Sequence, residues 1–318
     1  MPVLSVEGLT TNYRTLRGWV KAAENVNFDV EKGQAVGVVG ESGCGKTTVA
    51  LSILKLLPRG GKIRRGKIIF DGTDIVPLSD KEMRAIRWKG ISIVFQGAMN
   101  ALNPVFKVGD QIIEAIKTHE PDLPKSDARA RAEGLLEMVG VEPSRINNYP
   151  HEFSGGMRQR ALIAMALASN PKLLIADEPG TALDVIVQAQ VLQLMRGLKE
   201  KLGLSMMMIS HDLSIVAEVC EKVVIMYAGH VVEYGEIGEI FKEPLHPYTQ
   251  GLMGAFPSIK GNKQKLVSIP GQPPDLLNPP PGCPFYPRCP YAMDVCKTKF
   301  PESKKMGSAE HYVSCYLY

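Results

Sequence analysis

Eight residues, GESGCGKT from Gly40 to Thr47, constrain the fold of this chain more than any other stretch. They continue the apolar run AVGVVG and lead into TTVALSILKLL, so a glycine-rich turn joins an expected strand to an expected helix. Glycines in such a turn let successive backbone N–H groups point at phosphate oxygens, and the helix N-terminus adds a favourable dipole. The alternative is a purely structural glycine turn, but motif and context together favour a phosphate-binding loop.

The loop predicts the roles of its polar side chains. Lys46 is expected to reach the β and γ phosphates of a nucleotide, and the Thr47 hydroxyl to bind Mg²⁺. The residues that we assign to nucleotide binding here are Gly40, Glu41, Ser42, Gly43, Cys44, Gly45, Lys46, Thr47 and Thr48.

Two adjacent carboxylates end a second apolar run, LLIADE. Because uncompensated buried charge is costly, Asp177 and Glu178 make little sense as core residues. Asp177 is suited to Mg²⁺ coordination, direct or through water, and Glu178 to orienting and deprotonating an attacking water. The alternative is a solvated strand end, which the phosphate loop upstream disfavours.

The order of apolar runs and helical patterns predicts an α/β fold with a mostly parallel sheet. Residues from about 97 to 160 change to a helix-rich pattern, which predicts an inserted helical subdomain. A hairpin is expected to turn at AGH in VVIMYAGHVVEYGE. Prolines then crowd the sequence, which predicts a domain of residues 1–240 and a small irregular C-terminal extension of residues 241–318.

Charge and hydropathy exclude few classes of function or partner. The formal net charge is +4, and the basic cluster PRGGKIRRGK is expected to be a solvated turn rather than a nucleic-acid surface. No charged-then-apolar leader is visible, and runs such as ALIAMALA are too short to cross a bilayer. These features predict a cytoplasmic chain that does not span a membrane.

A second anion-binding helix start is expected in FSGGMRQR. Ser154 stands at the N-cap of a helix, with Gly155 and Gly156 exposing backbone N–H groups. The simplest alternative is an ordinary capped helix. One chain seldom needs two such helix ends, unless the second grips the nucleotide of a partner subunit.

Six motifs in a fixed order identify a resemblance that covers roughly residues 1–240. The motifs read GESGCGKT, VFQ with Gln96, FSGGMRQ, LLIADE, ALD with Asp184, and ISHD with His211. In this order they resemble the ATP-binding subunits of ABC transporters, whose core is a P-loop NTPase fold with an inserted helical subdomain.

The resemblance implies roles that the residues alone do not fix. It implies that Tyr13 stacks on adenine, that Gln96 touches the metal or water and reports to the helical subdomain, and that Asp184 couples two sites across a dimer. It also implies that His211 contacts the γ-phosphate and holds Glu178 and water in line. The implied catalytic set is Lys46, Gln96, Glu178 and His211, the implied Mg²⁺ ligands are Thr47, Gln96 and Asp177, and the implied partner-facing residues are Ser154, Gly155, Gly156 and Asp184.

Two positions depart from the general family pattern. Phe153 and Met157 stand where Leu and Gln are commonest, and Gly180 follows DEP where Ser or Thr is usual. The first departure is typical of one subgroup. The second loosens the chain beside Glu178.

Four further stretches, FQGAMNALNPVFKVGDQI, FSGGMRQR, PLHPYTQGLM and GCPFYPRCPYAMDVC, closely resemble the ATPases of oligopeptide and dipeptide importers. The resemblance implies a peripheral ATPase on the cytoplasmic face of the membrane. Its implied partners are a second, related ATPase subunit, two permeases and an external solute-binding protein, with no nucleic acid.

Two other interpretations remain. One is a soluble ABC ATPase acting on nucleic acid or ribosomes, which usually carries a long coiled coil, a zinc hook or a second ATPase module, and none is visible. The other is an inactive regulatory subunit, which the presence of Glu178 and His211 disfavours.

Four of the six cysteines lie in the C-terminal extension. Cys283, Cys289, Cys296 and Cys315 are separated by five, six and eighteen residues, which is not the CxxC spacing of structural zinc sites. The resemblance implies a [4Fe–4S] cluster for some family members, zinc is the second choice, and four reduced thiols are the third. A metal here is expected to stabilise a proline-rich module with a thin core.

Overall fold

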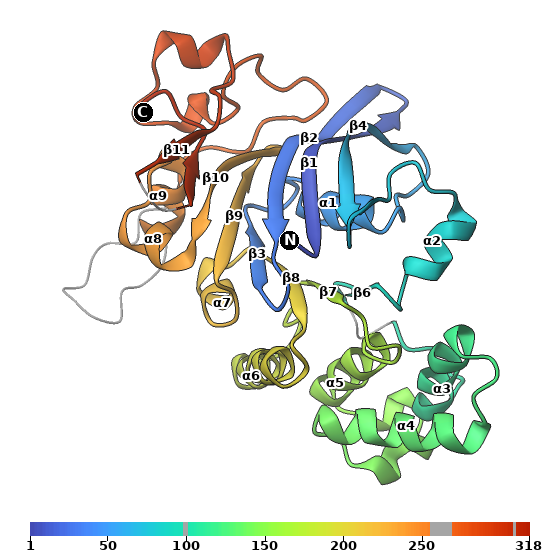
Figure 1. The fold of residues 1–318 in the computed structure, drawn as a ribbon. Helices are drawn as coiled ribbons and strands as arrows, with labels where there is room; N and C mark the ends of the chain where they lie inside the picture. Colours follow the sequence, from blue (N-terminus) through green and yellow to red (C-terminus); the bar gives the residue numbers. More distant parts are fainter. Residues whose placement is uncertain (98–100, 255–268, 308–309) are drawn as a thin grey trace. The chain divides into compact units, whose positions relative to one another are not determined.

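The computed structural model describes residues 1–97, 101–254, 269–307 and 310–318 (Figure 1). The chain forms two compact units. The first comprises residue 1 and residues 31–34 and 77–208, and the second comprises residues 2–30, 35–76 and 209–318. Each unit is built from segments that are distant in sequence, so long-range contacts define both.

The second unit contains the phosphate-loop sequence. Its strands and helices are β1 (Leu4–Thr15), β2 (Gly18–Val30), β3 (Ala35–Val39), α1 (Lys46–Ile53), β4 (Gly61–Phe70), β5 (Thr73–Asp74), α7 (Leu213–Ala217), β9 (Lys222–Tyr227), β10 (His230–Glu236), α8 (Ile237–Lys242), α9 (Pro247–Gly254), β11 (Lys304–Met306) and β12 (His311–Val313), with short 3-10 turns η4 (Tyr286–Arg288) and η5 (Asp294–Lys297).

Two sets of strands form the sheets of this unit. One set has the order β2-β1-β4-β5 and is antiparallel, and the other has the order β11-β12-β10-β9-β3. Strand β3 runs parallel to β9, with Val36 opposite Lys222, and all five residues of β3 are buried. Burial on both faces explains why β3 is a continuous apolar run rather than an alternating one.

The predicted hairpin at AGH is confirmed. Strands β9 and β10 pair antiparallel, with Tyr227 opposite His230, so Ala228 and Gly229 form a two-residue turn. Both turn residues have positive φ, 47° and 86°, as the two-residue turns that match strand twist require.

The first unit carries the helix-rich stretch. Its elements are α2 (Asp80–Ile86), β6 (Ile91–Val94), α3 (Val108–His119), α4 (Lys125–Met138), the 3-10 turns η2 (Pro143–Asn147) and η3 (Pro150–Glu152), α5 (Gly155–Ala166), β7 (Leu173–Asp177), α6 (Val185–Leu202) and most of β8 (Ser205–Ser210).

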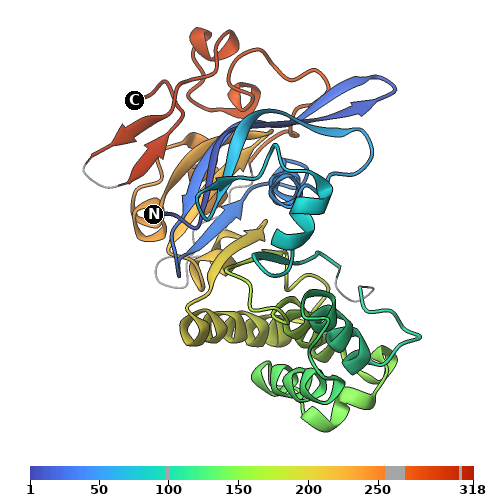
Figure 2. The same cartoon turned by 45° about the vertical axis from the view of Figure 1, so that its right-hand side comes forward.

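Within the first unit, the expected helices and buried strands are present. Figure 2 shows α3, α4 and α5 gathered together, and their inward faces carry buried residues such as Ile112, Ile116 and Leu136. The predicted subdomain of residues 97–160 therefore contains helices and turns, although residues 98–100 lie outside the described chain. The strands have the order β8-β7-β6, and every residue of β7 and β8 is buried.

The C-terminal extension is more regular than predicted. Strand β12 pairs with β10, with Tyr312 opposite Tyr234, and β11 pairs with β12. Residues near the C-terminus therefore add two short strands to the edge of the sheet beside β10 (Figure 1). The extension was predicted to be irregular, and these two short strands were not foreseen, because a three-residue strand such as HYV carries too little periodicity to be recognised. The proposed division at residue 240 stays a prediction.

Candidate functional site

The phosphate loop lies between β3 and α1, as predicted, and close backbone approaches explain two of its glycines. Gly45 has φ of 107°, and a Cβ there would lie 2.0 Å from the carbonyl oxygen of Ala22. A Cβ on Gly40 would lie 2.1 Å from the carbonyl oxygen of Met226. Any side chain at either position would displace backbone, so these glycines are required by packing as well as by the turn.

Lys46 is buried against the loop that precedes it. Its Nζ donates to the carbonyl oxygens of Gly40, at 2.6 Å, and of Glu41, at 3.0 Å. The ammonium is thus held over the loop by backbone oxygens, while Ser42, Gly43 and Thr47 are exposed. A fixed positive charge beside exposed loop residues is the arrangement that an anionic ligand needs.

Tyr13 lies beside the start of α1. Its hydroxyl donates to Oγ1 of Thr48 at 3.4 Å, and a Cβ on Gly61 would lie 2.7 Å from its ring. The ring therefore borders the same unit's phosphate loop, where a base-stacking role was predicted.

The structure brings Gln96 and Glu178 together within the first unit. Gln96 Nε2 donates to Glu178 Oε2 at 2.8 Å, and Thr181 Oγ1 donates to the same oxygen at 2.9 Å. Glu178 follows β7 with a φ of 46°, a left-handed conformation that is uncommon for a residue with a Cβ. Two hydrogen bonds and a strained backbone fix the direction of this carboxylate.

Asp177 differs from its neighbour in environment. It ends β7 and is 1% exposed, whereas Glu178 is partly exposed. One carboxylate of the pair is therefore buried, and the other reaches the surface of the unit.

The serine-glycine motif and the aspartate loop are neighbours. Ser154 caps α5 by accepting from the N–H of Met157 at 3.3 Å, and Asp184 caps α6 by accepting from the N–H of Val187 at 2.9 Å. A Cβ on Gly156 would lie 2.6 Å from Cγ1 of Val187. Two helix N-termini therefore start close together in this unit, and Gly156 permits that approach.

His211 directly follows β8 and is exposed. The turn after it is rigid, because Asp212 caps α7 by accepting from the N–H of Ser214 at 2.8 Å, and the N–H of Asp212 donates to Oγ of Ser210 at 3.0 Å. His211 and the phosphate loop belong to the second unit, and Gln96, Glu178 and Asp184 to the first.

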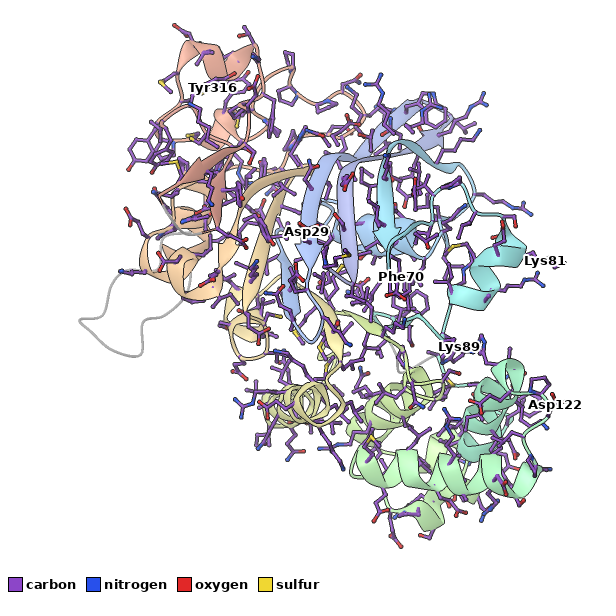
Figure 3. The ribbon with its side chains drawn as sticks, viewed as in Figure 1. Asp29, Phe70, Lys81, Lys89, Asp122 and Tyr316 are labelled. Atoms are coloured by element: carbon purple, nitrogen blue, oxygen red, sulfur yellow. The ribbon has the colours of Figure 1, made fainter. Side chains whose placement is uncertain are left out.

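The four C-terminal cysteines line one cavity. Its wall contains Cys283, Cys289, Cys296 and Cys315 together with aromatic and proline side chains. Burial raises the pKa of the Cys283 thiol to about 12, and the neighbouring thiols add to that rise. Tyr316, labelled in Figure 3, lies in the same wall. The cysteines that are scattered in sequence are thus gathered in space.

A metal at these cysteines is not confirmed. In the part of the chain that the structure describes, no group of three or more His, Cys, Asp or Glu side chains is arranged to hold a metal ion. The four cysteines share one cavity wall, which by itself does not establish the geometry of a metal site.

Comparison with known proteins decides the family. Residues 23–181 match the family model described as ABC transporter. The chain is 49% identical to the oligopeptide transport ATP-binding protein OppD of Bacillus subtilis, over 99% of its own length and 88% of that protein. It is 48% identical to the dipeptide transport ATP-binding protein DppD of the same organism, over 99% of this chain and 94% of that protein.

The chain belongs to the ABC transporter family.

Solved ABC structures share the fold. The ATP-binding cassette MJ0796, in a dimeric post-hydrolysis state bound to ADP and Pi, has a TM-score of 0.66 and 29% sequence identity, and the match covers 74% of this chain and 98% of that one. The predicted fold, an ABC ATPase with an α/β core, is therefore confirmed.

The C-terminal extension has a family model of its own. Residues 232–296 match the model described as the C-terminal region of oligopeptide/dipeptide transporters. This confirms the subgroup predicted from the cysteine-rich stretch. Among the helices that the structure describes, none is long and apolar enough to span a membrane.

The unusual glycine after DEP has a physical reason in this ABC chain. A Cβ on Gly180 would lie 2.6 Å from Cγ of Gln188 in α6. A larger residue would therefore require the partly exposed Gln188 side chain to shift. The glycine leaves the contacts that orient Glu178 in place.

Sequence reasoning missed two residues that touch the phosphate loop. Arg288 pairs with the Glu41 carboxylate at 2.7 Å, and the Tyr248 hydroxyl accepts the N–H of Glu41 at 2.9 Å. They lie 247 and 207 residues from Glu41 in sequence. The only signal was their place inside subgroup motifs, HPYTQGLM and FYPRCP, which gave no partner.

Proposed function

We propose that this chain is the ATP-binding and ATP-hydrolysing subunit of an ABC importer that carries oligopeptides or dipeptides into the cell. The observation that carries the proposal is the similarity, over nearly the whole chain, to proteins named for oligopeptide and dipeptide transport. The similarity includes the C-terminal region that is specific to such transporters. The relatives are transport proteins, which favours this function over a soluble ATPase acting on nucleic acid or ribosomes.

In this proposal the phosphate loop binds the triphosphate. Backbone N–H groups of residues 40–48 surround the phosphates, Lys46 neutralises charge on the β and γ phosphates, and Tyr13 stacks on adenine. The position of Lys46 over the loop carbonyls supports its part, because the ammonium is already held beside the loop.

Glu178 acts as the general base in the hydrolytic step. It takes the proton of the attacking water while oxygen attacks the γ-phosphorus and ADP leaves. Gln96 and Thr181 hold one carboxylate oxygen of Glu178, which fixes the direction from which the water is activated. His211 is assigned to hold the γ-phosphate and the water in line.

The donor set suits Mg²⁺. Thr47, Gln96 and Asp177 supply hydroxyl, amide and carboxylate oxygens, the ligands that this hard cation prefers. When bound, Mg²⁺ neutralises charge that develops on the phosphate oxygens.

Two ATPase subunits are proposed to act together. The Ser154 motif of each subunit would contact the nucleotide held by the other, and Asp184 would couple the two sites. The close N-termini of α5 and α6 support this, because both can direct N–H groups at an anion from a partner. The partner is proposed to be a related subunit, and the pair to sit at the cytoplasmic face of the membrane on two permeases that receive solute from an external binding protein.

The chain is further proposed to consist of an ATPase domain, residues 1–240, and an extension, residues 241–318. For the extension we propose a [4Fe–4S] cluster held by its four cysteines, with zinc as the alternative. Each thiolate of such a cluster binds a different iron, so the four sulfur atoms must surround one space, and the proposal is supported by the fact that all four cysteines line the same cavity. The buried thiols also need a cation to become thiolates, given the raised pKa of Cys283.

The cluster can be tested directly. The full chain, purified without oxygen, should contain iron and acid-labile sulfide, and Cys289→Ser should lose them. Cys220→Ser is the control, because Cys220 is a buried thiol outside the cavity. Zinc without sulfide would support the alternative. If the chain contained neither iron nor zinc, the four cysteines would be reduced thiols without a metal.

The transport proposal is tested by co-expressing the chain with its candidate permeases. The intact assembly should import a labelled peptide in an ATP-dependent manner. Glu178→Gln should bind ATP but hydrolyse it at least about a hundredfold more slowly, with import lost. Equal hydrolysis by the variant, or an assembly that forms without permeases, would contradict the proposal.

A further inference from the structure

Glu41 is the residue of the phosphate loop that the C-terminal extension holds. Its backbone N–H donates to the Tyr248 hydroxyl at 2.9 Å, and its carbonyl oxygen accepts from Lys46 Nζ at 3.0 Å. Its carboxylate receives the guanidinium of Arg288. Each polar group of Glu41 thus has a partner, and two of these partners, Tyr248 and Arg288, come from the extension.

The contact between Arg288 and Glu41 is bidentate. Nη1 donates to Oε2 at 2.7 Å and Nη2 donates to Oε1 at 3.0 Å. The side chains are 5% and 27% exposed, respectively. Two parallel charge-assisted hydrogen bonds, shielded from water, are among the strongest polar contacts that a protein makes.

The other donors of Arg288 are also engaged. Nε donates to the carbonyl oxygen of Pro270 at 2.8 Å, Nη1 to the Tyr227 hydroxyl at 3.2 Å, and Nη2 to the carbonyl oxygen of Ile269 at 3.3 Å. A guanidinium has five N–H groups, and all five have an acceptor. Arg288 therefore has one orientation, and so has the carboxylate that it grips.

Tyr248 is equally fixed. Its ring packs against Tyr227, with ring centroids 4.7 Å apart, and against Phe285, at 5.4 Å. All three rings are buried. Phe285 and Arg288 both belong to the segment 283–289, whose two ends are cysteines of the cavity wall. The supports of Glu41 are therefore part of the same rigid module as the cysteines.

We propose that Arg288 and Tyr248 are positioning residues of the nucleotide site: they fix Glu41, and with it the carbonyl that holds Lys46, so that the C-terminal extension sets the affinity of the phosphate loop for ATP. The proposal rests on the proposed ATP-binding function. Because such coupling is reciprocal, nucleotide binding also tightens the hold of the extension on the loop.

The test measures the Kd of the full-length chain for a fluorescent ATP analogue with Mg²⁺. Arg288→Met should raise the Kd about tenfold, and Glu41→Gln by a similar factor. The double variant should be no weaker than either single variant, because both remove one interaction. Tyr248→Phe keeps the buried ring, removes only the acceptor of the Glu41 N–H, and should raise the Kd about fivefold.

The matched control is Lys297→Met, which removes an exposed ion pair with Asp294 in the same module. It should leave the Kd unchanged. In the assembled transporter, Arg288→Met should raise the KM for ATP while kcat at saturating ATP is kept, a split that mere loss of folded protein does not produce.

Two results would contradict the positioning role of Arg288 and Tyr248. If Glu41→Gln and Tyr248→Phe leave the Kd within twofold of the native chain, or if the effects of Arg288→Met and Glu41→Gln multiply, the proposal is overturned. Glu41→Gln and Tyr248→Phe keep the test valid if Arg288→Met fails to fold. Lys46→Ala separates the positioning role from the proposed ATP-binding function. If Lys46→Ala weakens ATP binding while the variants of Glu41, Tyr248 and Arg288 do not, only the positioning role fails. If Lys46→Ala has no effect on ATP binding, the proposed function fails.

Discussion

Glu233 is a buried carboxylate that joins three segments of the second unit, and its replacement gives a sharp prediction for stability. Its side chain is fully buried on β10. Oε1 accepts from the N–H of Leu245 at 2.8 Å and lies 2.7 Å from Nε2 of His311, and Oε2 accepts from the N–H of His246 at 2.9 Å. The carboxylate thus fixes both the start of the C-terminal extension and strand β12.

The structure gives the size of the effect of Glu233→Gln. The amide oxygen can replace Oε1 and keep the contacts with Leu245 and His311, but the amide nitrogen then faces the N–H of His246. One charge-assisted hydrogen bond is lost and two donors are buried against each other. Losing the bond and leaving a buried donor unsatisfied together cost about 3 kcal/mol in the free energy of unfolding.

The assay is urea unfolding followed by far-UV circular dichroism, with limited proteolysis to find the segment that opens. Glu236→Gln is the matched control, because Glu236 is an exposed carboxylate on the same strand. The control should change the free energy of unfolding by less than about 0.5 kcal/mol. If Glu233→Gln is no more destabilising than this control, the argument from buried hydrogen bonds is refuted.

Three further predictions concern the phosphate loop, a partly buried histidine and a helix cap. Gly45→Ala should weaken MgATP binding by more than about tenfold, since its Cβ would lie 2.0 Å from a backbone carbonyl, whereas Gly238→Ala, where a Cβ meets open space, should not. His230 stacks on Phe300, and burial lowers its pKa to about 4. Between pH 6.5 and 4 the unfolded chain therefore binds more protons at this histidine, so His230 should contribute a fall of up to about 3 kcal/mol in the free energy of unfolding as the pH drops. His230→Gln should remove this contribution and leave that of the buried His246, whose pKa is also lowered to about 4. Asp184→Ala should cost about 1 kcal/mol in thermal unfolding through loss of the α6 cap, and Asp184→Asn should cost much less.

Features that depend on neighbouring residues could be predicted from the sequence. The phosphate loop follows β3 and leads into α1, and the hairpin turns at Ala228 and Gly229. In each case the glycine positions and apolar spacing lie within one short segment, so local rules are sufficient.

Features that depend on distant residues could not be predicted. The sequence gives no reason to pair Glu41 with Arg288, or β12 with β10, because no periodicity links segments so far apart. The resemblance assigned Gln96 and Glu178 to one catalytic site, but it predicted no contact between their side chains. The division of the chain into two units depends on long-range packing, which composition does not reveal.

The most direct test of the account is the affinity of the purified chain for MgATP, compared between the native protein and Lys46→Ala. Lys67→Ala is the control, because Lys67 is an exposed lysine of the same unit on β4. The account predicts that Lys46→Ala weakens binding by about a hundredfold, since a fixed ammonium beside the phosphates is lost, while the control is unchanged. Equal affinities for the native chain and Lys46→Ala would contradict the claim that residues 40–48 bind the triphosphate.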